Sequence, residues 1–170
     1  FKLKSTELND LIEEGKKIIT EINNTFDEFV HKLGIQNHVL QLEFEKVYGA
    51  VFFAESKKRY SGIRIYPDNE FQVVGFEAIR SDSPEVSKTL QKEVFKLILT
   101  GKNENEVKKY IKEFVEKIPS LSIENIALPI GIKQMDSYKN IPIHIRAAKL
   151  ANKYHNANIV SGDKIKYVYV

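Results

Sequence analysis

KKRYSGIRIYPDNEFQVVGFEAIRSDSP, residues 57–84, is the stretch in which the chain changes from strands to helices. Residues 57–66 and 71–76 flank the turn-forming triplet Pro67-Asp68-Asn69, which predicts a β-hairpin. From Ser81 the apolar spacing changes, and Asp82 or Ser83 is predicted to cap a helix whose first residue is Pro84. This stretch therefore separates strands that precede it from helices that follow it.

Before the hairpin, the sequence predicts one long helix and two strands. Apolar residues recur at three- and four-residue steps over residues 5–33, and Gly34 can end that helix. Residues 39–48 alternate apolar and polar side chains, and residues 50–54 form a short apolar run. Both segments are predicted to be strands.

After the hairpin, helices dominate. The helix from Pro84 is predicted to stop at Gly101, and a second helix to run from an Asn103 cap to just before Pro119. A strand-like stretch over residues 126–132 precedes a helix that opens at Pro142, and a final strand follows the turn Ser161-Gly162-Asp163. The helix from Pro142 is predicted to bury Ile143, Ala147, Leu150, Ala151 and Tyr154. The predicted fold class is α+β, a long helix with antiparallel strands followed by a mainly helical part with short strands.

Length and composition describe an ordinary globular chain of one domain or two small ones. Of its 170 residues, 42% are hydrophobic and 29% are charged, which excludes a disordered tail, a collagen-like repeat and a coiled coil. The net charge of +3 is uneven: residues 1–56 hold six lysines and ten acids, and residues 57–170 hold twenty basic and thirteen acidic residues. The predicted domain boundary therefore lies between residues 56 and 57, where the sign of the charge changes.

Several kinds of chemistry are absent from the sequence. It has no cysteine, which excludes disulfides, thiolate metal sites and cysteine nucleophiles and fits a reducing compartment. It has no glycine-rich nucleotide motif, and its four histidines are scattered without metal-ligand spacing. The first residue is Phe1 rather than Met, and the last strand pattern stops abruptly, so both ends are expected to be cut from something longer.

Two features carry candidate chemistry before any relative is considered. Glu43 and Glu45 lie two positions apart on a predicted strand, so their carboxylates would share one face and could support a divalent metal. The alternative is the solvated face of a half-buried strand. Lys57, Lys58, Arg59 and Tyr60 place three cations and a phenol on consecutive predicted strand positions, which suits contact with phosphates and sugars. The alternative is a basic edge strand that resists aggregation.

Further basic and aromatic groups lie toward the end of the chain. Arg80 could pair with Asp82 at a hinge, or the two could form one exposed pair of little energetic value. Tyr138, Lys139 and Arg146 lie near the last helix, and the alternative for them is an ordinary helix surface.

Taken in order, five segments resemble the C-terminal palm and thumb of family B DNA polymerases, and they resemble the archaeal type most closely. They are LEFE at 42–45, KKRYSG at 57–62, GFEAIRSD at 75–82, YKNIPIHI at 138–145 and GDKIKYV at 162–168. The resemblance implies that residues 1–56 are a C-terminal part of the palm and residues 57–170 the thumb with its Lys-Lys-Arg-Tyr junction. It implies that Glu43 and Glu45 assist a nearby catalytic metal site without binding the metal directly.

The resemblance implies that Lys57, Lys58 and Tyr60, with Arg59 as the variable member of the element, contact primer–template duplex DNA, and that Gly75, Glu77, Arg80 and Asp82 lie at the entry to the thumb. With the basic and aromatic groups near the last helix added, the predicted DNA-binding residues are Lys57, Lys58, Arg59, Tyr60, Arg80, Tyr138, Lys139 and Arg146. The family's catalytic aspartates have no counterpart in this chain, so the chain alone is expected to be inactive, and Mg²⁺ would act in the complete polymerase. The implied partners are duplex DNA and the remainder of the polymerase, with no membrane, in a cytoplasmic, nucleoid-associated setting.

Two other functions remain open from the sequence. One is a stand-alone, non-catalytic nucleic-acid-binding module. The other is a small metal-dependent hydrolase built on Glu43 and Glu45, which lacks a further ligand at suitable spacing.

Overall fold

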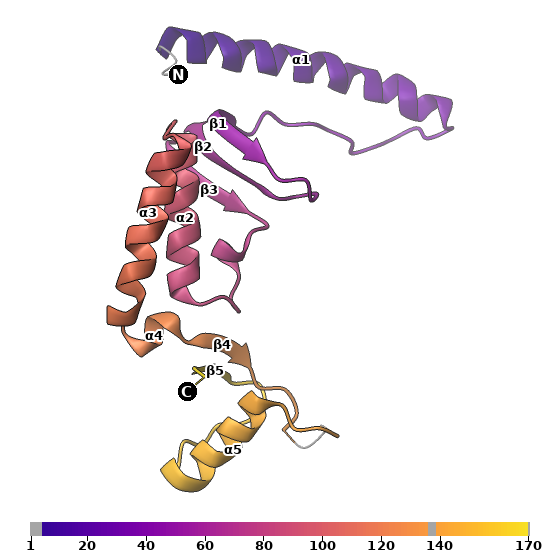
Figure 1. Cartoon of the computed structure of the whole chain (residues 1–170). Helices are drawn as coiled ribbons and strands as arrows, with labels where there is room; N and C mark the ends of the chain where they lie inside the picture. Colours follow the sequence, from indigo (N-terminus) through magenta and orange to yellow (C-terminus); the bar gives the residue numbers. More distant parts are fainter. Residues whose placement is uncertain (1–4, 136–138, 170) are drawn as a thin grey trace. The chain divides into compact units, whose positions relative to one another are not determined.

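The computed structural model describes residues 5–135 and 139–169, and within them it combines helices with two small antiparallel sheets (Figure 1). This agrees with the predicted α+β class. Two compact units are present: Phe1–Phe52 with Ser61–Gln72, called unit 1, and Phe53–Tyr60 with Val73–Val170, called unit 2. Among the residues described, none of the helices combines the length and the apolarity needed to cross a membrane.

The predicted long helix and hairpin are confirmed. Helix α1 spans Ser5–Lys32, and Gly34 follows it at a φ of 77°, a conformation that favours glycine at a helix end. Strands β1 (Val47–Phe53), β2 (Tyr60–Tyr66) and β3 (Glu70–Val74) form a sheet of order β1-β2-β3. The β2–β3 connection contains the predicted turn, where Arg64 is paired with Asp68 and Glu70.

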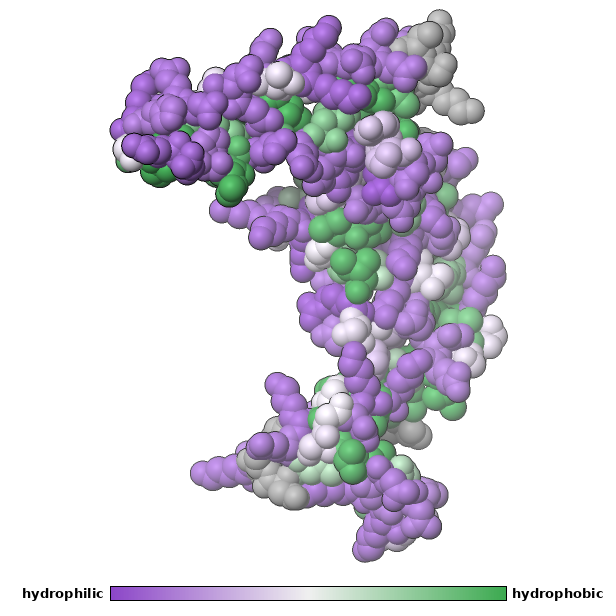
Figure 2. All heavy atoms as spheres, turned by 180° about the vertical axis from the view of Figure 1, so that it is seen from behind, coloured by the Kyte–Doolittle hydropathy of each residue, from purple (hydrophilic) through white to green (hydrophobic). Residues whose placement is uncertain are grey.

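Helix α1 is amphipathic but buries little of its apolar stripe. Ile12 and Val30 are buried, at 7% and 2% exposure. Hydrophilic residues cover much of the helix in the space-filling view, with green hydrophobic side chains along one edge (Figure 2). Several large apolar side chains remain exposed within unit 1: Leu11, Ile18, Ile22, Phe29 and Leu33.

The strand predicted over residues 39–48 is wrong for residues 39–46, which belong to no strand. The reason is a side chain of α1. The Asn23 amide donates to the Leu42 carbonyl at 2.9 Å, and its oxygen accepts from the Leu42 amide at 2.8 Å. Asn23 thus supplies both hydrogen bonds that a neighbouring strand would have given.

An aromatic side chain anchors the same segment against α1. The Phe44 ring lies 5.8 Å from the ring of Tyr66, centroid to centroid. It also fills the space above Gly15, where an added Cβ would lie 2.3 Å from Cε2 of Phe44. Gly15 therefore weakens the helix intrinsically but allows this close packing.

In unit 2, helix α2 spans Glu85–Leu99 and helix α3 spans Glu104–Lys117, and the two pack side by side (Figure 1). The predicted cap of α2 is wrong, because Pro84 is the N-cap residue and no side chain caps the helix. The Asn103 cap is confirmed: it forms a reciprocal capping box with Glu106. Short helices η1 (Glu77–Ile79), η2 (Ile118–Ser120) and α4 (Ile123–Ile126) complete this part.

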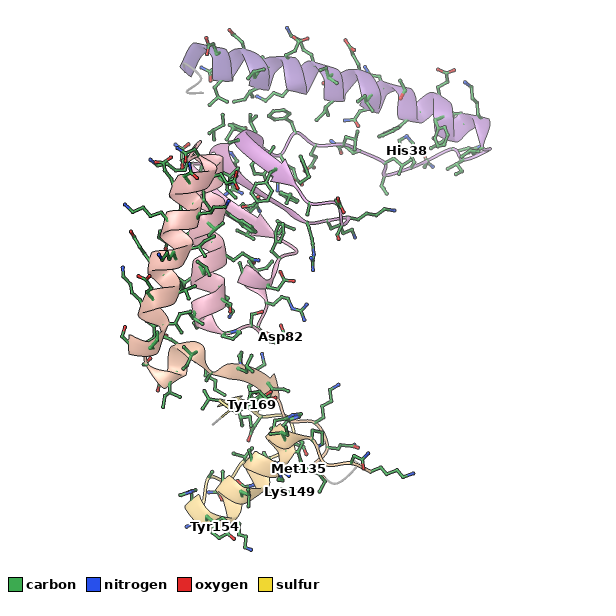
Figure 3. The ribbon with its side chains drawn as sticks, in the orientation of Figure 1. His38, Asp82, Met135, Lys149, Tyr154 and Tyr169 are labelled. Atoms are coloured by element: carbon green, nitrogen blue, oxygen red, sulfur yellow. The ribbon has the colours of Figure 1, made fainter. Side chains whose placement is uncertain are left out.

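The C-terminal part of unit 2 packs helix α5 (Ile143–His155) beside the antiparallel strands β4 (Leu128–Gly131) and β5 (Lys164–Tyr167). The core here is formed by Ile132, Ile145 and Ala148, with Met135, Ile159 and Ile165 packed against it (Figure 3 labels Met135).

The face predicted to be buried on α5 is wrong. Ile143, Leu150 and Tyr154 are about half exposed or more, at 50%, 49% and 64%, whereas Ile145 is fully buried. The buried face of α5 is instead formed by Ile145 and Ala148. On the buried side, Asn152 bonds both the amide and the carbonyl of Ile159 at 2.7 Å and so fixes the helix against the following loop.

Candidate nucleic-acid interface

The predicted basic strand begins as a turn. Lys57, Lys58 and Arg59 lie in the connection between β1 and β2, and only Tyr60 belongs to β2, so the placement of all four on a strand is wrong. Lys58 adopts a φ of 61°, which is unusual for a residue with a side chain. The Ala54 amide donates to the Arg59 carbonyl at 2.9 Å and closes the turn. Consecutive cations therefore do not alternate between two faces of a sheet.

Gly75 explains why the chain turns here. It has a φ of 75°, and a Cβ at this position would lie 2.3 Å from the Lys58 carbonyl oxygen and 3.0 Å from Cγ of Arg59. The backbone that follows β3 thus passes directly against the basic turn, and glycine is required for both the conformation and the approach. The contact joins residues 57–59 to residues 75–80 within unit 2.

Arg59 is held by two neighbours from the second of these segments. Its guanidinium donates to Glu77 Oε1 at 3.2 Å, and its Cζ lies 5.9 Å from the centroid of the Phe76 ring. Phe76 in turn packs edge-on against Phe95 of α2, with centroids 4.7 Å apart. The Arg59 side chain is therefore positioned by the helical core of unit 2 while remaining 37% exposed.

Glu77 and Gln91 link η1 to α2. The Gln91 side-chain oxygen accepts from the Ala78 amide at 2.6 Å, and its amide group donates to Glu77 Oε2 at 3.5 Å. The hydrogen bond from its own backbone amide, the contact with Gln91 and the charges of Arg59 and Arg80 lower the pKa of Glu77. Glu77 is thus held as a carboxylate between two arginines.

Arg80 pairs with Asp82, as both predicted alternatives required. Its Nε donates to Oδ1 at 2.8 Å and its terminal nitrogen to Oδ2 at 2.6 Å. The hydrogen bond and charge of Asp82 raise the pKa of Arg80, and the same bond lowers the pKa of Asp82. Both side chains are more than half exposed, so the pair contributes little to stability (Figure 3 labels Asp82).

Lys57 and Lys58 differ from the arginines because their charges are not compensated. Both are exposed, and neither takes part in an ion pair with any residue the structure describes. Tyr60 lies next to them with its ring 5.9 Å from that of Phe53. The turn therefore presents two uncompensated cations beside an aromatic pair.

The carboxylates Glu43 and Glu45 lie outside any strand, in the segment that Asn23 and Phe44 hold against α1. Both are exposed, and Glu45 lies 3.5 Å from Lys46 Nζ. Across the described ranges, no group of three or more His, Asp or Glu side chains is arranged to hold a metal ion. These two residues alone do not fit a metal site.

The remaining predicted residues belong to the α5 part of unit 2. Lys139 precedes α5 and Arg146 lies in its first turns, and both are exposed. Tyr138 lies outside the described residues. The contacts found within residues 5–135 and 139–169 do not join Lys139 or Arg146 to the basic turn.

The sequence singled out Gly75 and Glu77 within the segment GFEAIRSD, but it did not predict their contacts with Lys58 and Arg59 or the role of Gln91. Glu77 lies 18 residues from Arg59, and Gln91 lies 13 residues from Ala78, so these contacts join segments that are distant in the sequence. The glycine directly after a strand was the one available signal, because an isolated glycine there often marks a close backbone approach.

Comparison with known proteins shows several similarities. Residues 2–170 match the sequence model of DNA polymerase family B. A DNA polymerase of Archaeoglobus fulgidus is 34% identical over 134 residues, which cover 77% of this chain and 17% of that protein. DNA polymerase 2 of Aeropyrum pernix is 32% identical over 130 residues, 75% of this chain and 16% of that protein.

A solved structure gives the same result. The family B DNA polymerase from the hyperthermophilic archaeon Pyrobaculum calidifontis superposes with a TM-score of 0.60 at 30% identity, covering 77% of this chain and 17% of that one. The chain spans only about a sixth of the length of these relatives.

Proposed function

This chain belongs to DNA polymerase family B, and we propose that it is the part of such a polymerase that grips primer–template duplex DNA. In this proposal residues 1–56 are the C-terminal part of the palm and residues 57–170 are the thumb. The complete polymerase, a DNA-directed nucleotidyltransferase, would carry its catalytic aspartates and its Mg²⁺ outside this chain.

The observation that carries the proposal is the basic turn at residues 57–59. Lys57 and Lys58 are exposed and uncompensated, whereas Arg59 is oriented by Glu77 and Phe76. Mobile lysines suit phosphates as point charges, and a positioned guanidinium suits directed hydrogen bonds in a groove. Tyr60 adds a ring and a hydroxyl at the start of β2.

The other predicted residues have supporting roles in the proposal. Arg80, Tyr138, Lys139 and Arg146 would add contacts along the duplex. Glu43 and Glu45 would lie beside the active site and influence it through charge, without binding a metal ion themselves.

A second partner follows from the surface of α1. Four large apolar side chains of this helix, Leu11, Ile18, Ile22 and Phe29, remain exposed in unit 1, and such a surface commonly marks an interaction site. We assign it to the remainder of the polymerase.

Duplex binding at several salt concentrations tests the proposal. The 170-residue chain should bind a fluorescent primer–template duplex, with log affinity falling linearly with log salt by about 0.9 per phosphate contacted. Replacing both Lys57 and Lys58 by glutamine should weaken binding and flatten this slope by about 1.8, if each lysine meets one phosphate.

The matched control removes two lysines elsewhere in unit 2. Lys109 and Lys112 are exposed on α3, and their double glutamine variant has the same net charge as the test variant. It should keep the wild-type slope. No binding at low salt, or an equal loss in both variants, would contradict the proposal.

The stand-alone alternative is distinguished by complementation. The chain should restore synthesis when mixed with a family B polymerase that lacks its thumb. Tight duplex binding without restored synthesis would favour an independent binding module instead.

A further inference from the structure

A second basic feature of unit 2 lies away from the basic turn, in a cavity of about 230 Å³ between the start of α2 and the β4–β5 sheet. Three segments far apart in the sequence contribute to it: the stretch before α2, strand β4 and strand β5. Asp82, labelled in Figure 3, marks the first of these segments. The lining residues that carry charge or a hydroxyl are Ser81, Ser83, Glu85, Lys88, Lys164 and Lys166.

Three consecutive residues of β5, Lys164, Ile165 and Lys166, line this cavity. Side chains alternate along a strand, so Ile165 packs toward the core with Ile132 and Ile145, and Lys164 and Lys166 project to the opposite side. The strand pairs with β4, in which Lys166 stands opposite Pro129 and Lys164 opposite Gly131. Strand β5 thus carries Ile165 on one face and two lysines on the other.

The charge of the cavity is positive. Lys88 is only 17% exposed and lies 2.8 Å from Glu85 Oε1, so these two charges largely cancel. The hydrogen bond and charge of Lys88, with a smaller contribution from Lys166, lower the pKa of Glu85. Lys164 and Lys166 make no ion pair with the residues described, and Lys166 has only a 3.5 Å contact with the Glu124 carbonyl.

Neutral donors and three apolar residues, Ala127, Pro129 and Ile165, complete the lining. The hydroxyls of Ser81 and Ser83 can donate to an anion, and the first turn of the 15-residue helix α2 begins beside them without a capping side chain. The helix dipole adds to the positive potential there. Two uncompensated ammonium groups and two hydroxyls around one small cavity form a donor set that suits a phosphate group.

We propose that this cavity binds a phosphate group, and that the group is a backbone phosphate of the duplex held by unit 2. This rests on the proposed function, which it deepens by adding Lys164, Lys166, Ser81 and Ser83 to the residues that contact DNA. The cavity fixes one phosphate in position. Lys57, Lys58 and Arg59 of the basic turn do not line this cavity.

The test compares the double variant Lys164→Gln and Lys166→Gln with the α3 double variant Lys109→Gln and Lys112→Gln, both in the 170-residue chain. The β5 variant should bind duplex several-fold more weakly at low salt. Its salt slope should be shallower by about 0.9, the value for one lost phosphate contact. The α3 variant should match wild type.

Amide NMR separates the possible sources of the phosphate. Duplex should shift the amide resonances of Ser81 and Ser83 in wild type but not in the β5 variant, and the dispersed spectrum of that variant checks its fold. Inorganic phosphate that shifts these resonances when duplex does not would overturn the backbone assignment and favour a free phosphate. If neither shifts them, the cavity is not a phosphate site.

The two proposals fail in different ways. If wild type binds duplex with a steep slope and the β5 variant keeps that slope, this inference is wrong and the gripping role stands. If wild type does not bind duplex at low salt, the gripping role and the backbone assignment are both wrong.

Discussion

Replacing Gly75 by alanine should destabilise unit 2 by about 3 kcal/mol, which tests whether the basic turn is held by a backbone contact. Two effects add. The φ of 75° disfavours any residue with a Cβ by roughly 1–2 kcal/mol. The new Cβ would also lie 2.3 Å from the Lys58 carbonyl oxygen, and overpacking of this kind costs roughly 1–3 kcal/mol.

Gly101 provides a matched control in the same unit. It has a φ of 80°, but a Cβ there would meet no atom within 4 Å. Gly101→Ala should therefore show the conformational cost alone. The difference between the two variants isolates the contact with Lys58, because both lose the same backbone freedom in the unfolded chain.

Urea unfolding followed by far-ultraviolet circular dichroism measures both variants. With a slope near 2 kcal/mol per molar urea, a 2 kcal/mol difference lowers the midpoint of Gly75→Ala by about 1 M relative to Gly101→Ala. Gly75→Ala should also bind duplex more weakly than wild type, because displacement of the turn moves Arg59 away from Glu77. Equal midpoints for the two variants would refute the proposed contact.

Three further predictions concern stability. Gly15→Ala should destabilise unit 1 by about 1–3 kcal/mol in urea unfolding, because the Phe44 ring occupies the added methyl's place; the gain of about 1 kcal/mol expected from helix propensity alone would contradict this. Asn23→Ala should cost about 1–3 kcal/mol by the same assay, since it removes both partners of the Leu42 backbone. Glu77 has a lowered pKa in the folded chain, so its stabilising contribution should be present above pH 4.5 and be lost as the pH falls further. The free energy of unfolding, measured against pH, should decline less steeply for Glu77→Gln than for wild type. Identical profiles would count against the contacts of Glu77 with Arg59 and Gln91.

Local patterns in the sequence predicted most of the regular structure. The apolar period located α1 and α3, and the Asn103 cap and Gly101 stop were confirmed because caps depend on neighbouring residues. The five ordered segments indicated family B DNA polymerases of archaeal type, and the comparisons confirm that resemblance. The palm and thumb boundary at residues 56 and 57 remains a prediction.

The errors in predicting strands and buried faces share one physical cause, which is that contacts between elements distant in the sequence decided the outcome. Residues 39–46 have the alternation of a strand, but the Asn23 side chain bonds the backbone amide and carbonyl of Leu42 in place of a neighbouring strand. Ile145 and Ala148 are buried because the β4–β5 sheet lies on their side of α5, and a helix with apolar residues on two sides does not reveal which side that will be.

By itself, the sequence determined most of the helices and strands, the uneven charge and the family, because each depends on residue types at short separations. Only the tertiary structure decided that Lys58 passes against Gly75 and that Lys164 and Lys166 meet Ser81 and Ser83 around one cavity. These contacts join residues from 17 to more than 80 positions apart. No periodicity encodes such contacts, because they depend on how the finished elements pack.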